Sequence, residues 1–253
     1  MLSFSELKEF LDEKYLKYNT LSFIESDPIQ VPHSFTNQYD IEISAFLSSA
    51  IAWGKRSIII NNAKKLMKLM DNSPYDFVMN AGKDDMEHLN SFKHRTFNSV
   101  DLSFFVKSLR NIYKDHGGLS SIFESNATDL KLSLIEFRNL FLDIGFPQRT
   151  RKHIPDVLKN SAAKRLNLFL MWMVRKDKIG VHFGLWKKIS PSALKLPLDV
   201  HTANVGRKLG LLTRKQNDWL AVEEITSKLA IFDKDDPVKY DFALFGLGIF
   251  EKF

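Results

Sequence analysis

Two residues in the C-terminal part of the chain, a lysine and an aspartate, are of types that carry out covalent chemistry. Lys164 lies in the first turn of a helix predicted over 161–175, which is apolar nearly all round beyond that turn. Such a helix is normally central and buried. A lysine at its start can project into a cleft and lose solvent, which favours the neutral amine that acts as a nucleophile. The alternative is a solvated lysine at the start of a helix.

The aspartate follows Lys164 by 35 positions and precedes a second helix. Asp199 comes after an apolar Leu-Pro-Leu and before a helix predicted over 200–209, which stops at Gly210. The position by itself predicts an N-cap. The helix dipole keeps a capping carboxylate ionised, and a fixed anion beside a sugar can stabilise a developing oxocarbenium ion. His201 can bind a phosphate or hydrogen-bond this aspartate, and simple packing is the alternative.

Helical periodicity dominates the elements that must position these residues, so an all-α fold class is expected. We find no run of alternating strands joined by hairpin turns. Prolines and polar residues predict a loop over 26–34, and the polar segment 80–98 is expected to be irregular or weakly helical. Further helices are predicted from Ser3 or Ser5, from Asp40 to about Trp53, over 57–70, from Asp101 to Gly117, over 127–144, and from Asp236 over 238–250.

Composition excludes several kinds of site. The chain of 253 residues has no cysteine, which rules out disulfides, a thiolate nucleophile, cysteine-bound zinc and a four-cysteine iron–sulfur cluster. The seven histidines are scattered without metal-ligand spacing, and neither a glycine-rich phosphate loop nor a serine-hydrolase elbow is present. No metal and no cofactor are therefore expected.

Charge and hydropathy bear on partners and location. The net charge of +6 is compatible with a polyanionic partner but does not establish one. The N-terminus is amphipathic and acidic, unlike a signal peptide, and the longest apolar run, over 168–174, is too short to cross a bilayer. We expect a cytoplasmic protein without a membrane partner.

Three segments carry a resemblance to known proteins: 164–175 (KRLNLFLMWMVR), 197–202 (PLDVHT) and 236–246 (DPVKYDFALFG), supported by 42–54 and 101–123. They resemble a bacterial family of unknown function within the helix-hairpin-helix (HhH-GPD) superfamily of DNA glycosylases. The nearest pattern is that of the archaeal 8-oxoguanine DNA glycosylases. The resemblance implies one all-helical domain over 1–253, with two lobes and a central cleft. It also implies that Lys164 matches the nucleophilic lysine and Asp199 the essential aspartate.

Two positions depart from that pattern. The hairpin that precedes the lysine, 157–163, contains no glycine, whereas the family uses glycines there to bring backbone N–H groups to DNA phosphates. His182 stands where the family pattern leads us to expect an acidic residue. The missing glycines bear on how the chain would anchor DNA, and His182 bears on which substrate it takes or on whether it is active.

The activity implied by the resemblance is removal of a damaged base, such as 8-oxoguanine, from duplex DNA. The base would be extruded into a pocket, and the lysine would form a Schiff base with the sugar, followed by strand elimination. The resemblance also implies DNA contacts for a set of basic and aromatic residues, although a core position explains the tryptophans better than base stacking: Arg149, Arg151, Lys152, Lys159, His201, Trp53, Trp172 and Trp186.

Two other functions remain open from the sequence. One is a non-catalytic helical module that binds nucleic acid, or a protein, on a degenerate glycosylase scaffold. The other is a small-molecule binder that uses the phenylalanine-rich interior, since the chain has 21 phenylalanines. A monomer is expected in each case.

Overall fold

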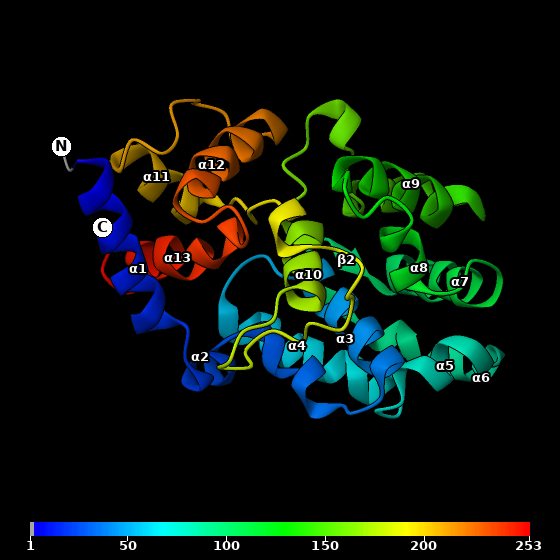
Figure 1. The fold of residues 1–253 in the computed structure, drawn as a ribbon. Coiled ribbons are helices and arrows are strands. Elements are labelled where there is room, and N and C mark those ends of the chain that lie inside the picture. The colour runs from blue at the N-terminus through cyan, green and yellow to red at the C-terminus, as the bar shows by residue number, and fades with distance from the viewer. Residues whose placement is uncertain (1–2) are drawn as a thin grey trace. The chain divides into compact units, whose positions relative to one another are not determined.

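The computed structural model describes residues 3–253 and is mostly helical, with 66% of residues in helices and 2% in strands (Figure 1). The chain forms two compact units. Unit 1 comprises the chain up to Phe23 together with Val157–Phe253, and unit 2 comprises Ile24–Asp156. The resemblance implies a cleft between two lobes, and this stays a prediction.

Unit 1 begins with a helix that the sequence predicts at its first turn. Ser3 caps α1 through a capping box, in which its hydroxyl accepts from the Glu6 N–H and the Glu6 carboxylate accepts from the Ser3 N–H. The α-helices of this unit are α1 (Phe4–Tyr18), α10 (Lys164–Val174), α11 (Val200–Lys208), α12 (Trp219–Phe232) and α13 (Asp241–Ile249), and the 3₁₀ turns are η5 (Val157–Lys159), η6 (Pro191–Ala193) and η7 (Pro237–Tyr240). Helix α2 (Leu21–Ser26) spans the boundary between the units.

Helix α13 lies at the centre of unit 1, where it packs against α1 on one side and α11 on the other. A glycine allows the close approach of α1, because a Cβ added at Gly246 would lie 2.1 Å from Cδ2 of Tyr18. The core is completed by apolar side chains from α1, α11, α12 and α13 and from the segment before α11, among them Leu11, Leu198, Val222 and Leu244. This packing holds the N-terminal end of α11, where Asp199 stands.

Unit 2 is organised around a helix that is buried over nearly its whole length. In α3 (Gln38–Ala50) every residue from Ile41 to Ala50 is buried. The other elements of the unit are η1 (Pro28–Gln30), η2 (Pro32–Ser34), α4 (Arg56–Leu69), α5 (Pro74–Asn80), α6 (Lys83–His88), η3 (Leu89–Ser91), β1 (Lys93–His94), β2 (Phe97–Asn98), α7 (Ser99–Asp115), α8 (Leu119–Glu124), α9 (Leu130–Asp143) and η4 (Gln148–His153).

Part of the phenylalanine-rich interior expected from the sequence lies in the core of unit 2. Phe46 of α3 lies 5.6 to 5.8 Å, centroid to centroid, from three rings on α7 and α9: Phe105, Phe137 and Phe141. All four side chains are buried. Such offset and edge-to-face pairs add to the stabilisation that burial of the rings provides.

Several elements differ from the sequence-based expectation. Asn37 caps α3 in place of Asp40, whose carboxylate instead accepts from the Tyr75 N–H, so the helix starts earlier than predicted. The segment 80–98, expected to be irregular or weakly helical, contains the short helix α6, in agreement with the second alternative, and the β1–β2 hairpin, which was not expected. Helix α12 was not anticipated, although Asp218 caps it with a bond from the Ala221 N–H.

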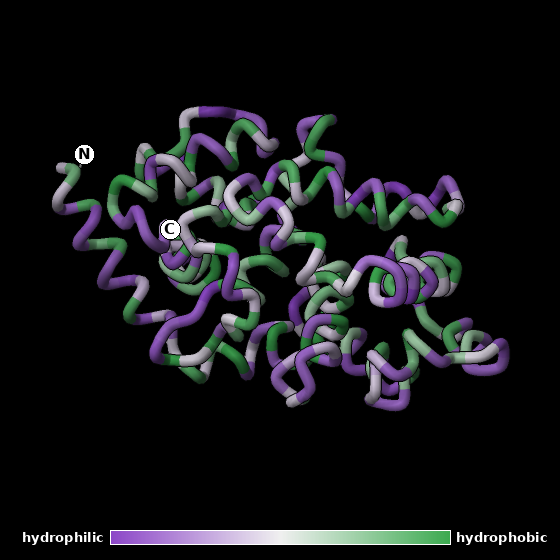
Figure 2. The backbone as a smooth tube through the Cα atoms, turned by 45° about the vertical axis from the view of Figure 1, so that its right-hand side comes forward, coloured by the Kyte–Doolittle hydropathy of each residue, from purple (hydrophilic) through white to green (hydrophobic). Residues whose placement is uncertain are grey.

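Hydropathy alternates along the backbone of most helices, as Figure 2 shows by its changes between purple and green. In the part of the chain from residue 3 onward, no helix has both the length and the apolar character that a bilayer crossing requires.

Candidate functional site

The lysine and the aspartate singled out from the sequence lie in contact within unit 1. Lys164 Nζ is 3.1 Å from Asp199 Oδ2. The lysine is the first residue of α10, and the aspartate is the N-cap of α11, so the starts of two helices bring the side chains together. The Lys164 side chain is 35% exposed and that of Asp199 is 15% exposed. The pair therefore lies at the surface of the unit with the amine accessible to a ligand.

The predicted cap role of Asp199 is confirmed. Its Oδ1 accepts a hydrogen bond of 2.9 Å from the Thr202 N–H, which leaves Oδ2 for Lys164. Burial acts to raise the pKa of Asp199, but the charge of Lys164 and the Thr202 N–H outweigh it, and the pKa lies below its usual value. Asp199 is thus an anion with one oxygen fixed by the backbone and the other directed to the amine.

Two buried polar atoms lie one helical turn beyond these residues. Asn167 Oδ1 and Thr202 Oγ1 have no hydrogen-bond partner within residues 3–253, and both side chains are 1% exposed. Asn167 follows Lys164 by three positions and Thr202 follows Asp199 by three, a spacing that places side chains on the same face of a helix. Buried polar atoms are nearly always satisfied, so these two are hydrogen-bonding positions still open on the helices that carry the pair.

The segment before α10 turns sharply without glycine. Asn160 and Ala163 both have positive φ, 63° and 47°. The Asn160 amide donates to Asp218 Oδ2 over 2.8 Å, and its carbonyl accepts from the Trp219 N–H, which ties the turn to the start of α12. The absence of glycine noted in the sequence is therefore compatible with a tight turn, because side-chain and backbone bonds hold the left-handed residues in place.

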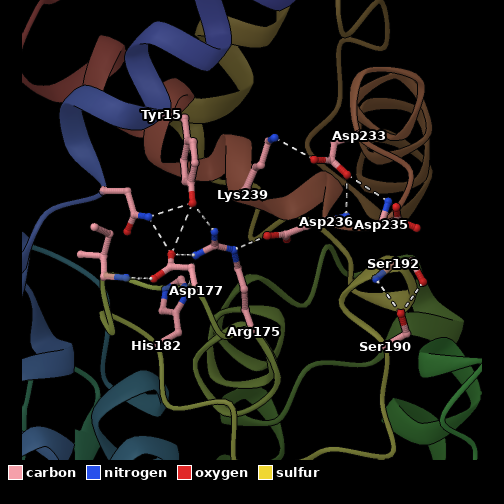
Figure 3. A network of polar contacts seen from close by, with 12 residues as sticks. Tyr15, Arg175, Asp177, His182, Ser190, Ser192, Asp233, Asp235, Asp236 and Lys239 are labelled. Atoms are coloured by element: carbon pink, nitrogen blue, oxygen red, sulfur yellow. Dashed lines mark hydrogen bonds and ion pairs between the residues drawn. The ribbon is translucent and has the colours of Figure 1, made fainter.

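The far end of α10 is fixed by a buried arginine, Arg175, which is 1% exposed and makes four polar contacts (Figure 3). Its partners come from three different parts of unit 1: Asp236 at 2.8 Å, Asp177 at 2.9 Å, His182 at 3.1 Å and the Tyr15 hydroxyl at 2.8 Å. The Tyr15 contact joins α10 to α1. The sequence did not single out Arg175, and the one signal for it is a charged residue at the end of an apolar helix.

The other members of the network explain why His182 stands where an acidic residue was expected. Arg175 already has two carboxylate partners, and an N–H of its guanidinium points to Nδ1 of His182, so the imidazole accepts this bond. Burial acts to raise the pKa of Asp177, but bonds from Asn19, the backbone and Arg175 hold it at about 2. Two carboxylates already outnumber the single charge of Arg175, so a third at the buried position 182 would add uncompensated negative charge.

Four more of the predicted DNA-contacting residues lie in unit 1, two of them exposed and two buried. Lys159 is exposed in η5, and His201 is exposed in the first turn of α11, where its charge contributes to the lowered pKa of Asp199. Trp172 and Trp186 are each 1% exposed and lie in the core, the alternative that the sequence left open for them. Their role in stacking on a base stays a prediction.

Three of the predicted phosphate contacts belong to unit 2. Arg149, Arg151 and Lys152 are exposed on η4. Arg149 pairs with the buried Asp101 at 3.1 Å and donates to the Thr96 carbonyl at 3.0 Å. Across residues 3–253, no group of three or more histidine and carboxylate side chains is arranged to hold a metal ion.

Comparison with known proteins identifies the family. Residues 27–250 match the family described as protein of unknown function (DUF2400). The chain belongs to this family. No curated protein and no solved structure matches it.

The family match covers both candidate residues of unit 1 and all of unit 2 except residues 24–26. It includes Lys164, Asp199 and the Arg175 network except Tyr15 and Asn19, which precede residue 27. The family description assigns no activity, so membership of the DNA glycosylase superfamily and any role of the Lys164–Asp199 pair are matters of proposal.

Proposed function

We propose that this chain is a DNA N-glycosylase with abasic-site lyase activity that removes an oxidised purine such as 8-oxoguanine from duplex DNA. The observation that carries the proposal is the 3.1 Å contact between Lys164 Nζ and Asp199 Oδ2. A primary amine beside a fixed carboxylate is the pair that a Schiff-base mechanism on a sugar requires. The helix-hairpin-helix glycosylase fold is part of the same proposal.

In the first step the amine lone pair of Lys164 forms a bond to C1′ of the sugar while the bond from C1′ to the base breaks. The base leaves with the electron pair of that bond and takes up a proton. Lys164 starts as an ammonium group, and Asp199 first accepts one of its protons through Oδ2 and passes it to solvent, which frees the lone pair. Asp199, ionised again, stabilises the positive charge that develops on the sugar, and the nitrogen of the adduct then gives its second proton to the departing base.

In the second step the C1′–N adduct opens the sugar ring and becomes an imine. Loss of a proton from C2′ then breaks the C3′–O bond, and the phosphate leaves with the bonding electrons. The strand is nicked, and hydrolysis of the imine returns the free amine. No oxidant or metal is needed, because electrons move only between the bonds named.

The surroundings of the pair support this chemistry. Asp199 keeps its position through the Thr202 N–H, so its anion needs little reorganisation during reaction. The unpartnered Asn167 Oδ1 and Thr202 Oγ1 supply polar groups for water or for a polar edge of the ligand. Lys159 and His201 are exposed on the same unit and supply positive charge for flanking phosphates.

The test is borohydride trapping on duplexes that contain 8-oxoguanine, uracil or an abasic site. The wild-type chain is expected to form a covalent adduct that Lys164→Ala abolishes. Asp199→Asn keeps an oxygen for the Thr202 N–H and removes only the charge, so it should fold normally and trap far more slowly. Lys215→Ala is the matched control, because Lys215 is exposed in the same unit and its contact with Arg207 is through the backbone carbonyl.

Absence of an adduct on all three duplexes with the wild-type chain would overturn the proposal. Salt-dependent DNA binding without an adduct would then favour the non-catalytic module. Retention of the adduct in Lys164→Ala would show that another amine is the nucleophile.

A further inference from the structure

Unit 2 has a hairpin whose tip is occupied by an arginine in a strained conformation. Strand β1 pairs with β2 through Lys93↔Asn98 and His94↔Phe97, which leaves a two-residue loop, Arg95 and Thr96. Arg95 has a φ of 53°, a left-handed value that such turns normally fill with glycine, asparagine or aspartate. A bulky residue kept in this region indicates that its side chain is needed there.

The hairpin tip is tied to two other segments of unit 2. A Cβ added at Gly54 would meet the Arg95 guanidinium at 3.0 Å, so the arginine side chain lies against the backbone of Gly54. His94 Nε2 lies 3.2 Å from the Trp53 carbonyl oxygen, and Arg149 donates to the Thr96 carbonyl at 3.0 Å. Segments 53–56, 93–96 and 149–153 therefore form one continuous surface, which we call the hairpin surface.

Buried side chains lie beneath the hairpin surface. Asp101 is fully buried, accepts a bond of 2.7 Å from the Thr150 hydroxyl and pairs with Arg149. The ring of His153 lies between the rings of Trp53, at 6.1 Å, and Phe97, at 5.0 Å. Because the buried carboxylate of Asp101 already pairs with Arg149, it does not compensate the charge of the other cations on the hairpin surface.

Five cations on the hairpin surface remain without a carboxylate. Lys55, Lys93, Arg95, Arg151 and Lys152 are all exposed, and within residues 3–253 none of them forms an ion pair. The three segments and the residues that flank them in the sequence contain no acidic residue. No aspartate or glutamate occurs between residues 42 and 71, between 87 and 101, or between 143 and 156. A surface with several positive charges that no carboxylate compensates attracts a polyanion.

We infer that the hairpin surface binds the phosphate backbone of a nucleic acid strand, with Lys55, Lys93 and Arg95 as contacts that join Arg151 and Lys152. Charges distributed over three segments fit a ligand with repeated phosphates, and guanidinium groups match phosphate oxygens in geometry. None of the large exposed apolar side chains of the chain lies in these segments, so the surface lacks the anchors that a lipid bilayer would engage. This inference deepens the proposed function, on which the choice of nucleic acid partly rests.

The experiment measures binding of an undamaged duplex oligonucleotide by fluorescence anisotropy over a range of salt concentrations. The variant combines Lys55→Gln, Lys93→Gln and Arg95→Asn, and asparagine is chosen because it tolerates the left-handed conformation of the hairpin tip. Each phosphate contact removed lowers the salt slope by about 0.9 and weakens binding about eightfold at ~0.1 M salt, so the triple variant should bind about 500-fold more weakly.

Lys114→Gln is the matched control. Lys114 is exposed and unpaired at the end of α7, about 20 Å along that helix from Asp101, and its loss should leave affinity and salt slope nearly unchanged. Equal affinity of the triple variant and the wild type for the duplex would overturn the inference, as would an equal loss of affinity in Lys114→Gln. Binding to phosphatidylserine vesicles is measured in parallel, and a triple variant that loses vesicle binding but keeps duplex binding would also overturn it. Undamaged DNA gives no adduct, so this test measures binding alone: loss of trapping with normal binding would refute only the glycosylase proposal, and unchanged binding of the triple variant would refute only this inference.

Discussion

Asp199 has two separable roles, one for each carboxylate oxygen, and a double-mutant cycle with Lys164 can measure them. Asp199→Asn retains an acceptor for the Thr202 N–H but removes the charge that faces the amine. Asp199→Ala removes both the cap and the charge. Lys164→Met keeps an unbranched side chain of similar length without the ammonium group.

The magnitudes follow from the geometry. Opposite charges 3.1 Å apart attract by about 5 kcal/mol at an effective dielectric constant of about 20. The Lys164 side chain is 35% exposed, so water screens most of this attraction, and a net contribution of about 1 kcal/mol to the free energy of unfolding is expected. Loss of an N-cap costs about 1 kcal/mol. We therefore expect Asp199→Asn to cost about 1 kcal/mol and Asp199→Ala about 2 kcal/mol.

The pH dependence has a definite sign. The pKa of Asp199 is lowered from its usual 3.8 in the folded chain, so its stabilising contribution is present above that value and is lost as the pH falls through the folded pKa. The difference between the wild type and Asp199→Asn should shrink to nothing in that acid range. Urea unfolding at several pH values, followed by circular dichroism, provides the measurement. A coupling energy near zero between Lys164→Met and Asp199→Asn, or a difference that persists in acid, would refute the reasoning.

Three further changes test other parts of the structure. Gly246→Ala places a Cβ 2.1 Å from the Tyr18 ring and should lower the free energy of unfolding by about 2 kcal/mol or more, measured as a lower Tm. Arg175→Met removes the cation of Asp236, whose side chain is 23% exposed, and should cost about 3 kcal/mol in the same assay, whereas a neutral result would contradict the assigned network. Arg95→Gly relieves the left-handed strain and should raise stability by roughly 0.5 kcal/mol while it weakens binding of duplex DNA, and a loss of stability would argue against strain at the tip.

Local signals in the sequence were sufficient to predict most helices. Ser3 and Asp199 cap helices where polar residues precede an apolar repeat, and Gly210 follows the end of α11 as predicted. The contact between Lys164 and Asp199 was also expected, but only from the resemblance, since 35 positions separate the residues. Local rules locate each helix start and contain no information on which two starts meet.

Features that depend on tertiary contacts were missed. The β1–β2 hairpin has an arginine where turn rules expect glycine or asparagine, so its sequence carries no turn signal, and the bond from Arg149 to the Thr96 carbonyl holds the tip instead. The Arg175 network joins residues 15, 175, 177, 182 and 236, and no spacing rule connects them. Both features are places where long-range interactions outweigh local preference.

The two ends of α10 differ in a way that suits the proposed chemistry. At the C-terminal end Arg175 binds four partners and is almost fully buried, so the helix cannot shift or rotate without breaking that network. At the N-terminal end no side chain caps the helix, in contrast to α1, α3, α7, α9, α11 and α12, and the preceding Ala163 is left-handed. A helix of 11 residues is about 16 Å long, which is short enough for rigidity at one end to determine position at the other. The end that carries Lys164 can therefore be exposed and lack a side-chain cap. The opposite end supplies the rigidity that a reactive amine needs in order to meet its substrate at a fixed distance.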